Sequence, residues 1–328
     1  MATVSRFRNS QAASRDPSVD SRGAMIDPHT LMRIKSLQLR ARKVMEGFFA
    51  GIHRSPYHGF SVEFSEYREY SPGDDLRYLD WKLFARTDRY YVKQFEDETN
   101  LRCTVLLDTS KSMSYGSGDF SKHEYARTAA ATIAYFLTMQ RDAVGLVTFE
   151  DKVVEYLPPR NRPGHMRRIM AELSREPAGK ATDLAGPLEE VAATVRKRGL
   201  IVIISDLLAS PELLSTRLGY LRSCGHDVVV FRVLDPREVK FDFENAAIFR
   251  DVESGKELYV DAEVAKANYH RRFEKHAQEL ESACQDLGVD FHSMTTDEPL
   301  EFVLFELLRA RMRRGRDQGR RNARQRTA

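Results

Sequence analysis

Three short oxygen-bearing side chains follow an apolar run about a third of the way along the chain. Asp108, Ser110 and Ser112 form a D-x-S-x-S pattern directly after RCTVLL. Alternate residues of a tight loop after a strand can point the same way, so the three oxygens can converge. These residue types suit three kinds of chemistry: capping a helix, binding a metal ion, or attacking a phosphate.

Two later positions extend the metal interpretation. Thr182 lies in GKATDLAGPL, which reads as a loop that opens a helix, and Asp206 ends the apolar run LIVIISD. Two carboxylates and three hydroxyls can surround a small hard cation, and Mg²⁺ prefers octahedral oxygen ligands while keeping some of its waters. The sequence therefore predicts a Mg²⁺ site, with Mn²⁺ or Ca²⁺ as alternatives, formed by Asp108, Ser110, Ser112, Thr182 and Asp206.

Each of these residues also has a simpler structural interpretation. Asp108 or Ser110 can cap the following helix, because Asp and Ser are favoured at that position. KATDL is a good helix start, so Thr182 or Asp183 can be its cap. An aspartate at a strand end, such as Asp206, can also end the strand by bonding loop backbone. Both interpretations stay open at this point.

The elements that must position these residues alternate between strands and helices. Short β-branched runs, typical of buried parallel strands, occupy 102–108, 143–149, 200–206 and 227–235, and a last short strand is expected at 289–294. Helical patterns occupy 122–140, 184–198, 211–223 and 264–287, with a last one from about 299. This order predicts an α/β fold with a Rossmann-like, doubly wound, mostly parallel sheet, in which ligands bind at the carboxyl ends of the strands. Asp108 and Asp206 both lie at that edge.

The remaining sequence divides the 328-residue chain into four parts. We expect a disordered polar leader over 1–27, a helix followed by a small β-rich accessory region over 28–100, the α/β domain over 101–310, and an Arg-rich disordered tail over 311–328. No stretch approaches the roughly 18–20 apolar residues of a membrane span. The three cysteines are far apart and read as reduced thiols, so we expect a cytoplasmic protein.

Longer stretches of the chain resemble a known bacterial family. D-x-S-x-S, a distant loop threonine and a later strand-end aspartate look like the metal-ion-dependent adhesion site of von Willebrand factor A domains. The likeness to the domain-of-unknown-function 58 family covers roughly 37–308, and rests on EFSEYREYSPGDDLRYLDWKLFARTDRYYVKQFEDETN, LLDTSKSM, GLVTF, LPPR, RGLIVIISD and GHDVVVFRVLDP.

The resemblance implies a non-enzymatic binding module with a von Willebrand factor A-like fold. In such a site Ser110, Ser112 and Thr182 bind the cation directly, while Asp108 and Asp206 act mainly through water and hydrogen-bond the serines. The cation then takes its last ligand from an acidic residue on a client protein. Members of this family often accompany MoxR-type AAA+ ATPases, so the resemblance implies a chaperone-like adaptor for such an ATPase in complex assembly or activation.

A strand-end aspartate also marks a class of phosphatases, which is the main alternative function. In the haloacid-dehalogenase type, the first aspartate of D-x-D attacks phosphorus and the second acts as general acid. Here Ser110 stands at the second position and cannot supply that acid. The chain also has no G-x-x-x-x-G-K-[ST] phosphate loop and no G-x-S-x-G nucleophile elbow.

An acidic and aromatic block precedes the sheet domain. Asp75, Arg77, Trp81 and Arg86 are candidates for a partner-binding surface, with the tryptophan as anchor and the arginines as forks. The alternative is that the alternating charges pair internally and fasten this region to the sheet domain.

The C-terminal tail carries eight arginines and one aspartate from Arg311 onward. The net charge of the whole chain is only +3, so the rest is mildly acidic. The tail can contact nucleic-acid phosphates, but it has no aromatic residue to stack on bases. We therefore keep nucleic-acid binding as a weaker third hypothesis and do not expect it to be the main function.

Overall fold

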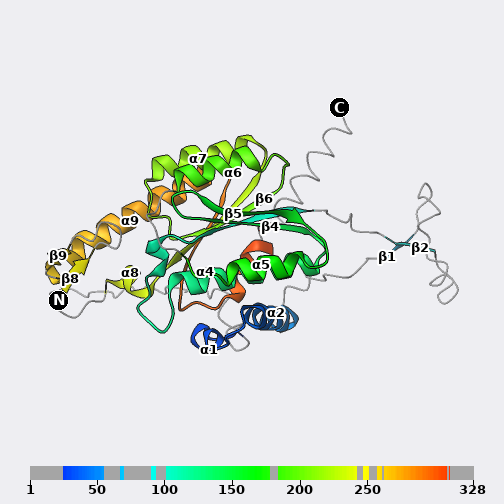
Figure 1. Ribbon diagram of the computed structural model, residues 1–328, viewed down its shortest axis with the longest axis horizontal. Helices are drawn as coiled ribbons and strands as arrows, with labels where there is room; N and C mark the ends of the chain where they lie inside the picture. The colour runs from blue at the N-terminus through cyan, green and yellow to red at the C-terminus, as the bar shows by residue number, and fades with distance from the viewer. Residues whose placement is uncertain are drawn as a thin grey trace, which may run out of the picture.

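A six-stranded sheet forms the centre of the protein (Figure 1). The computed structural model describes residues 25–54, 67–69, 90–93, 101–177, 184–241, 247–250, 257–260, 262–308 and 310. The strand order is β10-β7-β6-β3-β4-β5, and β4 with β5 is the antiparallel pair. The strands are β3 (Arg102–Asp108), β4 (Ala143–Phe149), β5 (Val153–Arg160), β6 (Leu200–Ser205), β7 (Asp227–Leu234) and β10 (Asp290–Thr295).

The strand order reverses beside β3, the first strand of this sheet along the chain. β3 pairs in parallel with β4 on one side and with β6 on the other. Every residue of β6 is buried, as its apolar composition requires of a central parallel strand. The carboxyl ends of β3 and β6 therefore meet at the switch point of the sheet, where this class of fold binds ligands.

Helices cover both faces of the sheet. In Figure 1, α6 (Ala185–Thr194), α7 (Pro211–Ser223) and α9 (Ala262–Asp286) lie on one side, and α4 (Lys122–Met139) and α5 (His165–Leu173) on the other. Side chains of β6 alternate between the two cores, as the period of a strand dictates: Ile201 and Ile203 pack with α6 and α7, whereas Val202 and Ile204 pack with α4. The sequence prediction of a mostly parallel, von Willebrand factor A-like α/β fold is confirmed.

The N-terminal helices belong to the core of the sheet domain. α1 (Pro28–Met32) leads into α2 (Leu37–Arg54), whose apolar side lies against α4. Phe48 is fully buried, with its ring centroid 5.9 Å from that of Phe136 and 4.7 Å from that of Phe305. The domain boundary expected near residue 101 therefore does not separate these helices from the sheet.

Several smaller elements complete the described structure. They are η3 (Lys111–Ser114), α8 (Pro236–Lys240), a helical segment at 301–308, and two antiparallel pairs, β1 (Tyr67–Glu69) with β2 (Tyr91–Lys93) and β8 (Ala247–Arg250) with β9 (Glu257–Val260). The β1–β2 pair lies in the region where β structure was expected. In the described part of the chain, no helix has both the length and the apolar character that crossing a membrane requires.

Candidate functional site

Asp108 ties together the ends of the two central strands. Its Oδ1 accepts a hydrogen bond from the Ser110 backbone N–H (2.9 Å), and its Oδ2 accepts one from the Ser205 hydroxyl (2.5 Å). Ser205 Oγ in turn accepts from the Leu207 N–H at 3.0 Å. Both carboxylate oxygens of Asp108 are thus engaged, and the residue is fully buried. Asp108 therefore acts as an anchor for the loops on both strands.

The two serines of D-x-S-x-S converge as the sequence predicts. Ser110 Oγ and Ser112 Oγ lie 3.0 Å apart, at the start of η3. Ser110 occupies the N-cap position of η3, but its side chain makes no capping hydrogen bond. Helix α4 is capped instead by Ser121, whose hydroxyl accepts from the Glu124 N–H. The capping interpretation of Ser110 is therefore wrong, and its hydroxyl remains beside that of Ser112.

A buried lysine shares this edge of the sheet with Asp206. Lys122 Nζ lies 2.9 Å from Asp206 Oδ2 and 2.7 Å from Glu238 Oε1. The side chains of Lys122 and Asp206 are both fully buried. The first turn of a helix disfavours positive charge, so Lys122 at the start of α4 must be stabilised by these two carboxylates. Lys122 thereby joins the β6 end, α4 and α8.

The charges of this cluster perturb one another. Burial and the neighbouring charge of Asp206 raise the pKa of Asp108 to about 6, against the opposing effect of hydrogen bonds from Ser205 and Ser110. Burial alone would lower the pKa of Lys122, but Asp206 and Glu238 outweigh it and raise that pKa. Asp108 is thus a carboxylate in an environment short of positive charge, and a further cation nearby would stabilise its ionised form.

The backbone turns sharply just after Asp206. Leu207 adopts a positive φ of 54°, which is uncommon for a residue other than glycine. The Asp206 carbonyl accepts a hydrogen bond from Arg232 Nε at 3.2 Å, and Arg232 is itself buried. The Arg232 contact thus holds the backbone at the end of β6, while the Asp206 carboxylate itself is held by Lys122.

The donors present fit a hydroxyl-rich cation site. Asp206 Oδ1 is buried and has no hydrogen-bond partner among the described residues, although Oδ2 of the same carboxylate is paired. Within the described ranges there is no group of three or more histidine, cysteine, aspartate or glutamate side chains able to hold a metal ion. A carboxylate cage is therefore not what these residues build. Ser110 and Ser112 would hold the ion, with Asp108 and Asp206 supplying negative charge around it.

Some of the predicted site residues cannot be placed. Thr182 lies outside the described residues, and so do the four candidates for a partner-binding surface, Asp75, Arg77, Trp81 and Arg86. Sequence reasoning also missed the role of Lys122, which began the helix expected over 122–140 and belonged to no recognised motif. The local signal available was its position in the first turn of a helix, where a lysine is unfavourable.

A doubly wound sheet with a D-x-S-x-S loop at its switch point defines a von Willebrand factor A-like protein. The chain belongs to the family described as "Protein of unknown function DUF58", whose model matches residues 66–282.

Relatives and solved structures are similar over much of the chain. An uncharacterized protein of Mycobacterium tuberculosis (strain ATCC 25618 / H37Rv) is 28% identical over 281 residues, which cover 84% of this chain and 88% of that protein. The crystal structure of the conserved hypothetical protein BatB from Bacteroides thetaiotaomicron is similar with a TM-score of 0.46 at 16% identity, covering 65% of this chain and 99% of that one. The SpRpn10 VWA domain gives a TM-score of 0.40 at 13% identity, with coverages of 62% and 94%.

Proposed function

We propose that this protein is a non-enzymatic, Mg²⁺-dependent protein-binding module that takes an acidic residue of a client as the last ligand of its metal ion. The family and the von Willebrand factor A-like fold support the coarser assignment, a protein-interaction module. The main support for Mg²⁺-dependent binding is the convergence of two serine hydroxyls. Ser110 Oγ and Ser112 Oγ lie 3.0 Å apart, beside the buried carboxylates of Asp108 and Asp206.

The charge balance of the cluster supports an acidic partner. Lys122 offsets part of the negative charge of Asp206, and it also contacts Glu238. A divalent ion placed on the two serine hydroxyls therefore keeps much of its charge uncompensated. Such an ion attracts one more anionic ligand, and a carboxylate is the oxygen ligand that another protein offers most readily.

A role beside a MoxR-type AAA+ ATPase is the biological setting that we propose for this module, in the cytoplasm. The chain would bind the client through the metal edge of the sheet, and the ATPase would act on the assembled complex. Any ATP-dependent step would belong to the separate ATPase, because this chain has no Walker-type phosphate loop.

For the phosphatase alternative, one structural feature is favourable and another is unfavourable. Lys122 brings a cationic side chain to the acidic pair, as phosphate chemistry would require. However, Asp108 is fully buried with both oxygens hydrogen-bonded, so it is not placed to attack a substrate. Ser110 moreover stands where the general acid is needed. We therefore favour binding over catalysis.

The test compares capture of the MoxR-type ATPase and its clients from the native host with and without chelator. We expect Mg²⁺-dependent capture by the wild-type chain and its loss in Asp108→Ala. Unchanged capture by Asp108→Ala would contradict the adhesion-site assignment. Hydrolysis of a generic phosphomonoester by the wild-type chain, abolished in Asp108→Ala, would favour the enzyme instead.

A further inference from the structure

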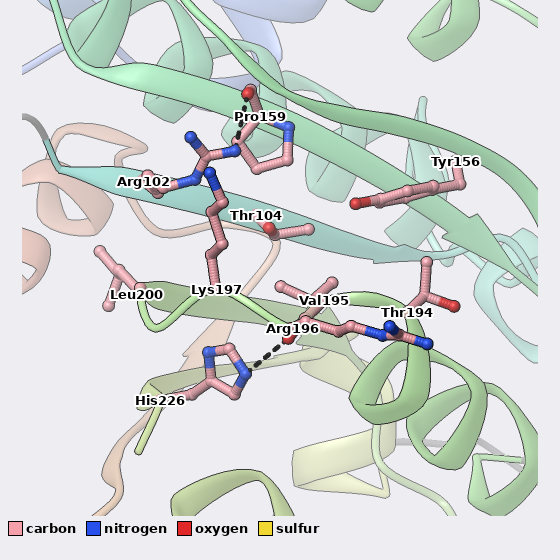
Figure 2. A pocket seen from close by; sticks show the side chains of 11 residues that line it. Arg102, Thr104, Tyr156, Pro159, Thr194, Val195, Arg196, Lys197, Leu200 and His226 are labelled. Carbon is pink, nitrogen blue, oxygen red and sulfur yellow. Dashed lines mark hydrogen bonds between the residues drawn. The ribbon is translucent and has the colours of Figure 1, made fainter. Parts of the chain in front are cut away.

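A second candidate site lies at the opposite edge of the sheet. A pocket of about 210 Å³ opens beside the amino ends of β3 and β6, next to the loop between α6 and β6 (Figure 2). Arg102 begins β3 and Asp108 ends it, so the pocket is about 20 Å from the serine loop at roughly 3.3 Å per residue. The pocket is therefore independent of the proposed metal site.

An early end of α6 creates the loop that lines this pocket. The sequence pattern predicts a helix over 184–198, but α6 ends at Thr194. The Val195 carbonyl accepts a hydrogen bond from the buried His226 ring through Nε2 at 2.9 Å, which holds the loop against β7. Gly199 is required for the close approach to β3, because a Cβ there would lie 2.4 Å from the Arg102 carbonyl oxygen.

Three cationic side chains line the pocket, and no carboxylate does. They are Arg102, Arg196 and Lys197, and none of them forms an ion pair with a carboxylate of the described residues. In Figure 2 the Lys197 side chain extends across the pocket in the direction of the Arg102 guanidinium, which donates to the Pro159 carbonyl at 3.3 Å. Lys197 and Arg102 are like charges held close together without counterions and repel one another, so an anion placed between these two would be stabilised. The Arg196 side chain extends away from them, toward Thr194 (Figure 2).

Polar groups around these cations complete a hydrogen-bonding lining. Thr104, Thr194 and Tyr156 contribute hydroxyls. His226 is 1% exposed, and its Nδ1 is buried without a hydrogen-bond partner among the described residues. Because Nε2 is the nitrogen that donates to the Val195 carbonyl, Nδ1 of a neutral His226 ring is left as an acceptor.

The size of the pocket limits the ligand. A volume of about 210 Å³ falls below the usual range of pockets for drug-sized ligands. Arginine side chains bind phosphate oxygens in a bidentate manner, and lysine adds a point charge. We propose that this pocket binds a small phosphate-class anion, of the size of inorganic phosphate or pyrophosphate, through Arg102 and Lys197, with Arg196 adding positive charge at the Thr194 end of the pocket.

Calorimetric titration of the full-length chain with phosphate and with pyrophosphate, at constant ionic strength, tests the proposal. We expect saturable binding that weakens at least tenfold in Lys197→Met and by a smaller factor in Arg196→Met, because Arg196 points away from Arg102 and Lys197. Lys197 and Arg196 are both exposed, so their substitution leaves the core intact. Arg168→Met is the matched control, since Arg168 is an exposed arginine on α5 away from this pocket, and it should bind like the wild type.

Three results would overturn the proposal. These are no saturable binding of either anion at tens of millimolar, equal binding in Lys197→Met and wild type, or an equal loss in Arg168→Met. A malonate titration separates phosphate from carboxylate, because malonate that binds as tightly as phosphate would contradict the assigned ligand class. Thermal unfolding of each variant checks that a loss of binding is not a loss of fold.

Discussion

At the scale of single residues, Lys122 determines how the acidic pair can exist inside the protein. Asp108 and Asp206 are both fully buried, and two buried carboxylates that share a site repel each other. Lys122 contacts one of them directly, and Ser205 and Ser110 hydrogen-bond the other. The two carboxylates are therefore stabilised in different ways. The charge of Lys122 stabilises Asp206, and hydrogen bonds from Ser110 and Ser205 stabilise Asp108. Sequence analysis identified the aspartates but not the lysine, because the pairing partners lie 84 and 116 residues away.

Replacing Lys122 should strongly destabilise the fold. Lys122→Met leaves the Asp206 carboxylate buried without its counterion, which typically costs about 3–5 kcal/mol. We expect a correspondingly lower midpoint in urea unfolding, and a smaller loss in the double variant Lys122→Met/Asp206→Asn, in which the uncompensated charge is also removed.

Lys43→Met is the matched control for this experiment. Lys43 pairs with Glu46 on the exposed side of α2, where solvent screens the interaction, so the midpoint should hardly change. Equal stability of Lys122→Met and the wild type would mean that the buried ion pair does not have the role assigned to it.

The cysteines provide a second prediction at this scale. Cys103 and Cys284 are buried and Cys224 is exposed, and burial raises the pKa of Cys284 to about 11. The thiolate is the reactive form, so Cys284 should react very slowly near neutral pH. A colorimetric thiol assay should find one fast equivalent in the native chain and three after unfolding. Loss of the fast equivalent in Cys224→Ser is the check, and fast labelling of Cys284 would contradict the packing of α9.

At the scale of elements, a strand or helix end could be predicted from the sequence only where its own residues carry a clear pattern. β3, β4, β6 and β7 were recognisable because buried β-branched runs carry their own pattern. β10 was expected as a last short strand although only its Met294 is buried. β5 was missed because VVEYLPPR contains two prolines and lies at an edge, where proline is tolerated but weakens the strand signal. The end of α6 was also missed, since the residues of 195–198 are compatible with a helix and the tight approach at Gly199 is a tertiary contact.

The packing of α2 against the sheet domain leads to a prediction about element stability. Phe48→Ala removes a fully buried ring that contacts Phe136 and Phe305, so we expect a loss of about 3–5 kcal/mol in urea unfolding. Phe49, the next residue, is only partly buried, and Phe49→Ala should cost less than half as much. A separate unfolding transition for α2, with the sheet domain unaffected by Phe48→Ala, would mean that α2 is not part of this core.

At the scale of the whole molecule, the sheet separates two chemically opposite edges. The carboxyl edge gathers hydroxyls and buried carboxylates around Asp108, and the amino edge gathers cations around the pocket beside Arg102. Both follow from the same topology, since parallel strands place all their carboxyl ends together. The first edge was predictable because D-x-S-x-S is a compact motif. The second was not, because its cations come from separate elements and meet only in the folded chain.

The central claim is that the serine loop binds a divalent cation, and titration of the purified chain with Mn²⁺ followed by electron paramagnetic resonance tests it most directly. We predict one site per chain that Mg²⁺ displaces, and at least a tenfold loss of affinity in Ser112→Ala. Ser112 is half-buried, so this substitution should spare the fold. Ser114→Ala, at an exposed position of the same turn, should bind like the wild type. Equal affinity in Ser112→Ala and wild type, or no site at all, would contradict the claim.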